Sequence, residues 1–407
     1  MVKEALRTEL PNDWKALGLG NYAQIYRGGS PRPIQNYLTT SDTGVNWIKI
    51  GDVSTDAKYI TATEEKIIPE GIARSRMVYK GDLILSNSMS YGRPYILNIE
   101  GCIHDGWLVI QKYDKTFDRG YLYYALSSDQ TMQQYISMAA GSSVQNLNKE
   151  KVSKVVIPCP PIQEQRKIAD ILSDIDTLIT NLQKLIRKKK DIRQGTMQML
   201  LTGKNRLQGF SSEWKDTALG KICDIKDGTH QTPHYVESGI PFYSVETVTN
   251  DDFTHVKYIS LEEHERLTSS YKIDNGDVLM TRIGSIGKGK YVDWSPNASF
   301  YVSLALLKFR GNKPLANFIA LLTDTEEFQK EAELHSLQFA IPMKINLGQI
   351  SDIRVRIPTD QKEIKAIIAV LNDMGSEIKR LKQKLNKYKY LKQGMMEELL
   401  TGKVRLV

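Results

Sequence analysis

The chain has 407 residues, of which 41% are hydrophobic and 25% are charged. This composition is typical of a globular protein, and the length allows two cores of about 150 residues each. Its 55 lysines and arginines outnumber its 47 aspartates and glutamates, giving a net charge of +8 that favours an anionic partner, with nucleic acid the first candidate. No apolar run approaches the ~18 residues of a membrane span, and residues 1–10 lack the pattern of a secretory signal, so we expect a cytoplasmic protein without membrane contact.

The first globular region, residues 14–157, contains short runs of β-branched and aromatic residues broken by Gly, Pro, Asn and Asp. Residues 45–50 and 154–157 are examples. The pattern predicts a mixed α/β domain with short strands and exposed loops, and a helical stretch at residues 121–139. Cys102, Cys159 and Cys223 are widely spaced and form no CxxC pair, so we expect reduced packing residues rather than a disulfide framework or a zinc site.

Residues 158–206 predict a first long helix that starts at Pro160-Pro161 and ends at the left-handed cap Gly203. Its apolar positions alternate in steps of three and four, which is the spacing of a heptad seam, with Lys189 as the one interruption. The predicted seam is Ile168, Ile171, Ile175, Leu178, Leu182, Leu185 and Ile192.

Residues 207–357 predict a second domain of the same kind, with a helical stretch at residues 315–333. Residues 358–407 then predict a second long helix, with Asp360 and Glu363 spaced as a capping box and Gly402 as the terminal cap. Its predicted seam is Ile364, Ile367, Leu371, Met374, Ile378, Leu381, Leu385 and Tyr388.

The two halves of the chain are copies of one unit. Residues 158–206 match residues 358–405, with Gln194-Gly195 repeated as Gln393-Gly394, and Trp14-Lys15 recurs as Trp214-Lys215. Residues 81–86 (GDLILS) likewise match residues 276–281 (GDVLMT). A period near 200 residues indicates a duplicated domain rather than a solenoid.

We therefore expect an α/β (α+β) protein in which two similar domains, residues 1–157 and 207–357, are joined by the helical regions 158–206 and 358–407. The two helices should form an antiparallel coiled coil of roughly 58 Å, with pseudo-two-fold symmetry and with Leu406 near the N-terminus. Gly195 and Gly394 recur within these helices, where each costs ~1 kcal/mol relative to alanine. They predict a close helix crossing or a kink, the alternative being a gap that a partner's backbone uses.

Motifs of catalysis are missing from the sequence. Residues 284–288 (GSIGK) lack the spacing of a phosphate-binding loop, and neither a dinucleotide or S-adenosylmethionine fingerprint nor the Asn-Pro-Pro-aromatic motif of amino-methyltransferases is present. Glu-x-Lys triplets such as residues 363–365 have no Pro-Asp partner and are interpreted as charge patterning. Pro233 prevents His230 and His234 from sharing a helix face, so we interpret them as polar loop residues able to touch DNA rather than as metal ligands.

Two basic runs lie on the predicted helices. We interpret them as a solvated face of the helix pair; contact with DNA phosphate or an acidic partner is the alternative. They are Lys184, Arg187, Lys188, Lys189, Lys190 and Arg193 in the first helix, and Lys379, Arg380, Lys382, Lys384, Lys387, Lys389 and Lys392 in the second.

This set of features resembles the specificity subunits of type I restriction-modification systems over nearly the entire chain. The resemblance is carried by residues 157–165 (IPCPPIQEQ) and 200–204 (LLTGK), by the paired Trp-Lys openings, and by Gly141-Ser142-Ser143 ahead of Asn146-Leu147. The second copy departs from it in residues 359–364 (TDQKEI), and in Gln338-Phe339-Ala340 where the first has Gly-Ser-Ser.

The resemblance implies that the two dissimilar domains are target-recognition domains, each reading half of a split, asymmetric site on double-stranded DNA. The helices would fix their separation and recruit two modification subunits, and restriction subunits would join the complex. Methyl transfer and cleavage, with S-adenosylmethionine, ATP and Mg²⁺, belong to those partners, so no cofactor, metal or catalytic residue is expected here.

We predict DNA contacts from basic, amide and tyrosine side chains in loops near the repeated landmarks. In the first domain these are Arg27, Arg32, Arg74, Arg76, Asn87, Tyr91, Arg93 and Gln145; in the second they are Lys226, His230, Gln231, Tyr243, Arg282, Lys288, Lys290 and Lys344. Helix positions expected to set the spacing or bind partners are Ile168, Ile175, Leu182, Gly195, Ile367, Met374, Leu381 and Gly394. The alternatives are a two-helix scaffold that binds only protein and, third, a catalytic nuclease or methyltransferase.

Overall fold

The structure is a computed structural model that describes residues 10–54, 56–87, 92–139, 147–337 and 339–406. It divides into two compact units, and each unit combines one globular part with portions of two long helices. Unit 1 consists of residues 1–183 and 383–407, and unit 2 consists of residues 184–382. Each unit therefore draws on both halves of the duplicated chain.

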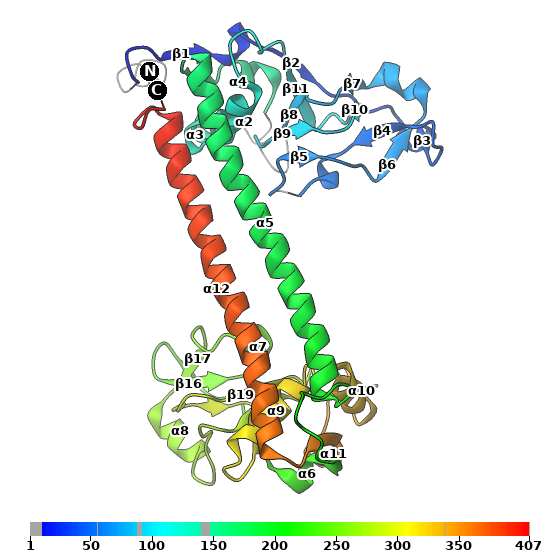
Figure 1. Cartoon of the computed structure of the whole chain (residues 1–407), viewed down its shortest axis with the longest axis vertical. Helices are drawn as coiled ribbons and strands as arrows, with labels where there is room; N and C mark the ends of the chain where they lie inside the picture. Colours follow the sequence, from blue (N-terminus) through cyan, green and yellow to red (C-terminus); the bar gives the residue numbers. More distant parts are fainter. Residues whose placement is uncertain (1–9, 55, 88–91, 140–146, 338, 407) are drawn as a thin grey trace. The chain divides into compact units, whose positions relative to one another are not determined.

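In its described part, unit 1 contains two five-stranded sheets and one separate antiparallel pair, β1 with β12 (Figure 1). Its central sheet has the strand order β2-β11-β8-β9-β5, and the other sheet has the order β3-β6-β4-β10-β7. The strands are β1 Lys15–Gly18, β2 Gln24–Arg27, β3 Leu38–Thr39, β4 Val45–Ile48, β5 Tyr59–Ile60, β6 Glu65–Ile67, β7 Arg76–Val78, β8 Leu83–Ser86, β9 Pro94–Leu97, β10 Gly101–Ile103, β11 Trp107–Gln111 and β12 Val156–Cys159.

The helices of unit 1 cover one face of its central sheet. Because successive side chains of a strand point to opposite faces, Leu83 and Leu85 of β8 pack in one core with helical residues such as Tyr121, while Ile84 packs in a separate core beside the other sheet. Both faces are buried, which explains the uninterrupted apolar run of β8. The helices are η1 Leu19–Asn21, η2 Ile34–Asn36, η3 Ile50–Asp52, η4 Pro69–Arg74, α2 Arg119–Ser127, α3 Asp129–Ala139 and α4 Lys149–Ser153.

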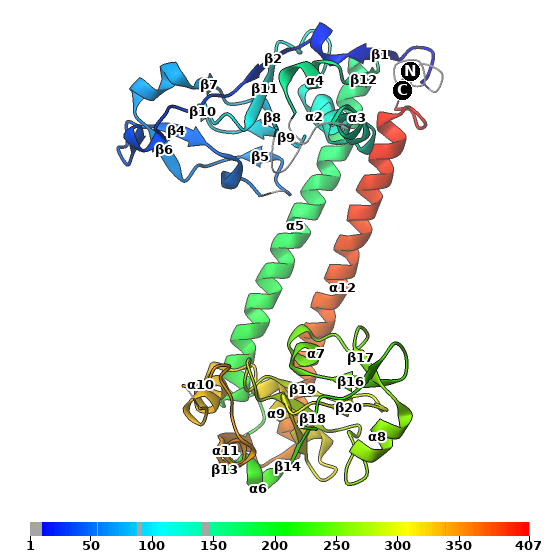
Figure 2. The same cartoon turned by 180° about the vertical axis from the view of Figure 1, so that it is seen from behind.

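Among its described residues, unit 2 also has two larger sheets and one separate antiparallel pair, but its larger sheets have four strands each (Figure 2). Its central sheet has the order β14-β21-β18-β19, a second sheet has the order β15-β17-β16-β20, and β13 pairs with β22. The strands are β13 Trp214–Ala218, β14 Asp224–Asp227, β15 Tyr235–Val236, β16 Ile240–Tyr243, β17 Lys257–Ile259, β18 Val278–Thr281, β19 Gly289–Tyr291, β20 Ser299–Phe300, β21 Leu304–Lys308 and β22 Arg354–Pro358.

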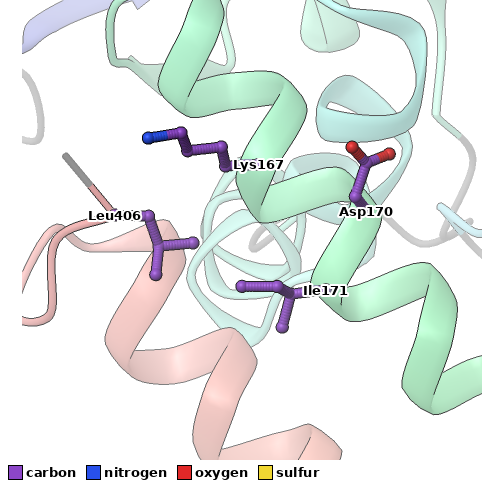
Figure 3. Close-up of a pocket in the computed structure, with 4 residues that line it drawn as sticks. All are labelled: Lys167, Asp170, Ile171 and Leu406. Carbon is purple, nitrogen blue, oxygen red and sulfur yellow. The ribbon is translucent and has the colours of Figure 1, made fainter.

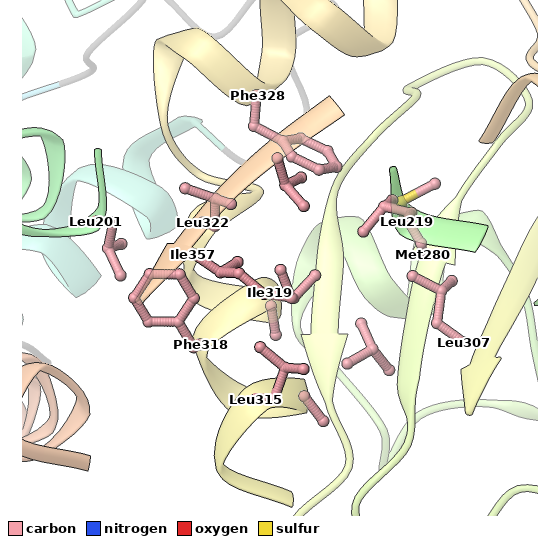
Figure 4. Close-up of a cluster of buried hydrophobic side chains, with 14 of the residues drawn as sticks. Leu201, Leu219, Met280, Leu307, Leu315, Phe318, Ile319, Leu322, Phe328 and Ile357 are labelled. Atoms are coloured by element: carbon pink, nitrogen blue, oxygen red, sulfur yellow. The ribbon is translucent and has the colours of Figure 1, made fainter. Parts of the chain in front are cut away.

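The main core of unit 2 lies between its central sheet and helices α9 and α10. Met280 and Leu307 of the sheet face Ile319 of α9 and Phe328 of α10 (Figure 4). Leu279 of the same strand as Met280 packs instead into a second core, so β18 repeats the alternation seen in β8. The helices are α6 Leu219–Ile222, α7 Val245–Asn250, α8 Leu261–Leu267, α9 Lys313–Leu322, α10 Glu326–Leu334 and α11 Leu347–Asp352.

The long helices are α5 Ile162–Leu201 and α12 Gln361–Leu400, 40 residues each. They run antiparallel in both units. In unit 1, Asp176 of α5 pairs with Lys392 of α12 at 2.7 Å, and in unit 2 Lys189 of α5 pairs with Glu377 of α12 at 2.8 Å. The predicted caps are confirmed, since Gly203 and Gly402 have φ of +73° and +76°.

The proximity of Leu406 to the N-terminal region is also as predicted. Arg405 lies 2.6 Å from the carboxylate of Asp13, and Leu10 and Leu406 pack against the same core of unit 1. The helical stretches predicted at residues 121–139 and 315–333 are present as α2 with α3 and as α9 with α10. Cys102, Cys159 and Cys223 are buried free cysteines, and burial raises the pKa of the Cys159 thiol to about 11.

The seam of α5 was predicted in the wrong register over much of its length. Leu178, Leu185 and Ile192 are 48%, 39% and 45% exposed, whereas Leu172 and Ile186 are buried. Two adjacent stripes of this helix are both apolar at heptad spacing, so the sequence pattern fits either one. Of the seam positions expected to set the spacing or bind partners, Ile168 and Ile175 are buried and Leu182 is half-buried in α5; in α12, Ile367 is buried and Met374 and Leu381 are half-buried.

The structure contradicts a close crossing at the helix glycines and a capping box at the start of α12. A side-chain carbon built at Gly195 or Gly394 would meet no atom within 4 Å, so neither glycine marks a close helix crossing. Asp360 caps α12 by accepting a 2.8 Å hydrogen bond from the Lys362 amide, but Glu363 does not complete a capping box. Its carboxylate is held by Arg206 at 2.7 and 2.6 Å instead.

Candidate nucleic-acid interface

One edge of the central sheet in unit 1 gathers the ends of three neighbouring strands. Strands β2 and β8 both pair antiparallel with β11, so the carboxyl ends of β2 and β8 meet the amino end of β11 at this edge. Arg27 ends β2, Asn87 follows β8, and Asp105 lies two residues before β11. Residues far apart in the sequence are thereby brought together.

Asp105 organises this edge through its backbone and its carboxylate. Its backbone oxygen accepts hydrogen bonds from Arg27 Nε at 3.0 Å and from Asn87 Nδ2 at 2.9 Å. Its carboxylate accepts a hydrogen bond from Ser30 Oγ at 2.9 Å and lies 3.6 Å from the guanidinium of Arg32. We call these five residues the Asp105 cluster; Arg27 is exposed, and 82% of the Arg32 side chain is exposed.

Two further predicted arginines adjoin the Asp105 cluster. Arg76 donates a hydrogen bond from Nε to the backbone oxygen of Arg27 at 2.9 Å, and its guanidinium lies 4.7 Å from the centre of the Tyr26 ring. The guanidinium of Arg74 lies 5.6 Å from the Tyr37 ring. A guanidinium stacked on a ring keeps its N–H edge available, which suits contact with phosphate or a base edge.

Unit 2 has the equivalent sheet edge, and four main-chain hydrogen bonds establish the match. In unit 1 they are Ser86 N to Arg93 O at 3.0 Å, Gly92 N to Ser86 O at 2.9 Å, Asn87 N to Gly106 O at 2.9 Å and Leu147 N to Asn87 O at 3.0 Å. In unit 2 they are Thr281 N to Lys288 O at 2.9 Å, Gly287 N to Thr281 O at 2.8 Å, Arg282 N to Ser303 O at 2.9 Å and Ile345 N to Arg282 O at 2.9 Å. Arg282 therefore stands where unit 1 has Asn87, and Lys288 stands where it has Arg93.

The polar cluster at this edge of unit 2 is built differently. Asp227 ends β14 at the position of Arg27, and its carboxylate is 2.6 Å from Arg282 Nη1 and 2.8 Å from His230 Nε2. Arg282 is 7% exposed, whereas 69% of the His230 side chain is exposed. We call these three residues the Asp227 cluster; the buried arginine fixes the aspartate, which in turn holds the exposed histidine.

The remaining predicted residues of unit 2 are exposed or half-buried, with one exception. Lys288 donates to the Thr249 backbone oxygen at 2.8 Å, and Lys290 pairs with Asp251 at 2.5 Å. Lys226 is half-buried near Tyr271, while Gln231 and Lys344 are exposed. Tyr243 is the exception, since it is 4% exposed and belongs to the core between the two sheets of unit 2.

The expectation that all predicted contacts lie in exposed loops is therefore wrong for Asn87, Tyr243 and Arg282, which are buried. It is also wrong for four residues that lie in strands, namely Arg27, Arg76, Lys226 and Lys290. Asn87 and Arg282 each follow a central strand. The Asn87 amide donates to the backbone oxygen of Asp105, and the Arg282 guanidinium donates to the carboxylate of Asp227. Arg93 is half-buried, and its amide donates to Ser86 Oγ at 3.1 Å. Tyr91 and Gln145 lie outside the described residues.

Asp105 and Asp227 are the residues that sequence reasoning missed. The sequence did contain one signal for these clusters, because a glycine follows the segment of β2 (Gly28) and the segment of β14 (Gly228). A side-chain carbon at Gly28 would lie 2.2 Å from the backbone oxygen of His104, and one at Gly228 would lie 2.4 Å from Tyr301. Both glycines thus permit the close approach between strand ends that assembles each cluster.

A groove of about 530 Å³ in unit 2 adjoins the Asp227 cluster. Its lining includes Tyr235, Tyr301 and Lys257, with the Lys257 amine 4.5 Å from the Tyr235 ring. Ser303 also lines it, and its backbone oxygen accepts the hydrogen bond from Arg282. Aromatic rings beside a lysine form a surface that can pack against sugars and bases.

Two apolar surfaces occur on α5. Leu178, Leu185, Ile192 and Met199 recur every seven residues and are 39–48% exposed, which forms one stripe. In unit 1, a shallow hollow of about 330 Å³ lies beside α5, with Ile171 and Leu406 facing one another across it (Figure 3).

In the described part of the chain, no helix is long and apolar enough to cross a membrane, and no group of three or more His, Cys, Asp or Glu residues could hold a metal ion.

Each copy of the duplicated mixed α/β domain has a polar cluster at the same sheet edge and is followed in sequence by a long helix, and these features define the class of this protein. The family model for the type I restriction modification DNA specificity domain matches residues 11–190 and again residues 211–389. The chain therefore belongs to the family of type I restriction-modification DNA specificity domains.

Individual relatives are similar over nearly the whole chain. The type I restriction enzyme MjaVIII specificity subunit of Methanocaldococcus jannaschii is 23% identical, covering 99% of this chain and 96% of its own. Two solved structures share the fold. One comes from a study of assembly and conformational transition of a type I R-M system (18% identity, 97% and 99% coverage, TM-score 0.63), and one is the S subunit from M. genitalium (16%, 96% and 97%, 0.57).

Proposed function

We propose that the chain is the specificity subunit of a type I restriction-modification complex and reads a bipartite, asymmetric site on double-stranded DNA. The observation that carries the proposal is that both units have the same sheet edge with the same backbone hydrogen bonds but with different side chains on it. Arg27 and Asn87 of unit 1 stand where unit 2 has Asp227 and Arg282. Equivalent scaffolds with unlike polar groups suit two unlike half-sites.

Each unit contributes both kinds of contact that DNA recognition needs. The exposed guanidiniums of Arg27, Arg32 and Arg74 would bind phosphate or guanine edges in one half-site. His230 and Gln231, supported by the Asp227 cluster, would read the other half-site, with Lys288 and Lys344 on phosphate. A duplicated domain fits this role because the two strands of a duplex are related by local two-fold axes, so similar domains can meet related backbones in the two half-sites.

The long helices would set the distance between half-sites and recruit two modification subunits, and restriction subunits would join them. The exposed apolar stripe on α5 supports a protein partner, since an unburied stripe at heptad spacing matches the face of another helix. S-adenosylmethionine, ATP and Mg²⁺ would then be bound by the partner subunits, and this chain would contribute no catalytic group.

The test is reconstitution of the chain with its modification subunits, followed by mapping of methylated positions on genomic DNA. We expect one bipartite site, and exchange of residues 214–345 for the matching domain of a relative should alter one half of it. A change in both halves would refute independent reading. Failure of the assembled complex to bind any duplex would favour the protein-only scaffold, and turnover by the chain alone would favour an enzyme.

A further inference from the structure

Lys58 begins a chain of polar contacts that ties the central sheet of unit 1 to both long helices. It directly precedes the edge strand β5, and its backbone oxygen accepts a 3.0 Å hydrogen bond from the amide of Ile96 in β9. Its amine donates to Tyr124 Oη of α2 at 3.0 Å and lies 3.4 Å from Ser173 Oγ of α5. The Lys58 side chain thus joins the segment beside the edge strand β5 to helices α2 and α5.

Tyr124 and Asp176 extend the chain of contacts to α12. The Tyr124 hydroxyl donates to Asp176 Oδ2 at 2.7 Å, and Asp176 Oδ1 lies 2.7 Å from the amine of Lys392. Only 22% of the Asp176 side chain and 27% of the Lys392 side chain are exposed, so water screens these charges weakly. Burial and the bond to Asp176 raise the pKa of Tyr124, so its hydroxyl stays a donor.

Unit 2 lacks this connection at the equivalent positions. The repeat places Gly375 where unit 1 has Asp176 and Arg193 where it has Lys392, and counting from the caps of α2 and α9 places Phe318 where it has Tyr124. Arg193 donates from Nε to the Leu371 backbone oxygen at 3.4 Å. Phe318 is completely buried in the apolar core and has no polar group to offer.

The corresponding polar contacts of unit 2 come from the end of α5, while α12 packs on the central sheet through apolar residues such as Ile367 and Leu371. Gln194 Nε2 donates to the backbone oxygen of Asp324 at 3.3 Å, and Gln198 Oε1 accepts from the amide of Glu326 at 3.2 Å. These contacts reach the turn between α9 and α10, not the edge strand of the central sheet. The sheet of unit 2 therefore has no counterpart to the Lys58 contact at these matched positions.

We propose that Lys58, Tyr124, Asp176 and Lys392 are positioning residues that fix the orientation of the first recognition sheet on the helix pair, while the second sheet retains more freedom. The mechanical part of this inference stands without DNA, and its consequence for DNA rests on the proposed function. In that role, the first unit sets a strict register for its half-site. The second unit accommodates small variations in the spacer.

The mechanical part is tested by hydrogen exchange on the full-length chain without DNA. Lys58→Met, which keeps the aliphatic stem, should speed exchange of the Ile96 amide and its neighbours in β9 by about fivefold to tenfold, the scale of one typical intramolecular hydrogen bond. Lys58→Arg should restore protection, and Lys167→Met, the same substitution at an exposed lysine of α5, should have no effect. Unchanged exchange in β9, or uniformly faster exchange throughout unit 1, overturns the inference.

The DNA part is tested with the assembled modification complex on duplexes whose spacer is native or one base pair longer or shorter. The wild type should prefer the native spacer, and Lys58→Met and Tyr124→Phe should reduce that preference about fivefold or more while methylation of the native site persists. A preference unchanged in both variants overturns the positioning role. Absence of methylation by the wild type would instead count against the proposed function and leave the exchange result standing.

Discussion

Glu164 and Glu363 hold the same place in the two repeats, and each is nearly completely buried while bound by an arginine from the far end of the other long helix. Glu164 accepts hydrogen bonds from Arg405 Nε at 2.8 Å and from Trp14 Nε1 at 3.1 Å. Glu363 accepts them from Arg206 Nε at 2.7 Å and from Trp214 Nε1 at 3.3 Å. Arg405 follows α12 and Arg206 follows α5. In each unit, therefore, the segment after one long helix binds the buried glutamate near the start of the other long helix.

Replacing either glutamate with glutamine should destabilise the protein by ~1–3 kcal/mol, because a charged hydrogen-bond acceptor is lost within a buried site. Urea unfolding of Glu164→Gln and Glu363→Gln measures the effect. Glu150→Gln is the control, since 58% of that side chain is exposed. Equal unfolding midpoints for all three variants and the wild type would contradict the structural role.

The pH dependence of stability should reveal the charge on Glu164. Burial alone would raise the pKa of this carboxyl, but the hydrogen bonds from Arg405, the Leu406 amide and Trp14 lower it below its ordinary value. A lowered folded pKa contributes stability above the unfolded value of about 4.3, and this contribution disappears as the pH falls through the folded pKa. The stability difference between wild type and Glu164→Gln should therefore be constant near neutrality and shrink below about pH 4. A difference that grows on acidification would be inconsistent.

Patterns that repeat along the chain could be predicted from the sequence. The duplication, both long helices with their glycine caps, the proximity of Leu406 to the N-terminal region, and the positions of α2, α3, α9 and α10 all follow from local periodicity or internal similarity. Fold class and family could therefore be inferred before any coordinates. The register of the α5 seam could not, because Ile171 and Leu172, and likewise Leu185 and Ile186, are adjacent apolar residues.

The candidate site was only partly predictable, because its organisation depends on pairings across long stretches of sequence. Asp227 meets Arg282 55 residues later, and Arg27 meets Asp105 78 residues later. An arginine in a loop cannot be assigned to the surface or the interior until its partner is known, which explains the wrong expectation for Arg282. Composition nevertheless located Arg27, Arg32, Arg74 and Arg76, which the structure brings to one end of unit 1.

Alanine at Arg74 and Arg27 should separate phosphate contacts from base contacts. If Arg74 binds phosphate, Arg74→Ala should weaken binding to all duplexes and lower the salt slope by about one unit. If Arg27 reads a base, Arg27→Ala should cost ~1–3 kcal/mol and relax one position of one half-site. Lys115→Ala is the control, because this exposed lysine follows the opposite end of β11. Binding assays at several salt concentrations decide, and sequence-independent losses from both arginines would rule out base reading by Arg27.

Arg282 and His230 should give different outcomes although both contact Asp227. Arg282→Met leaves Asp227 without its buried counter-charge and should destabilise the protein by ~2–4 kcal/mol. His230→Ala removes an exposed side chain and should leave stability unchanged while weakening recognition of one half-site. Thermal unfolding and binding to half-site variants measure the two effects. Loss of stability in the histidine variant would make it structural, and normal DNA recognition by that variant would remove it from the interface.

Lengthening both helices tests whether they set the spacer between half-sites. Seven residues inserted after Gln183 and after Lys382, at the boundary between the two units, keep the heptad register and leave the Asp176 contacts intact. Each helix lengthens by ~10 Å, which corresponds to roughly three base pairs at ~3.4 Å per pair. Three base pairs also rotate the second half-site by about 100°, since a turn takes ~10.5 pairs, so weaker binding alone does not answer the question.

A four-residue insertion at the same points breaks the register and serves as the control for misfolding. Methylation mapping of the assembled complex should show the original half-sites about three base pairs further apart. A folded, active variant that keeps the original spacer would show that helix length does not define it.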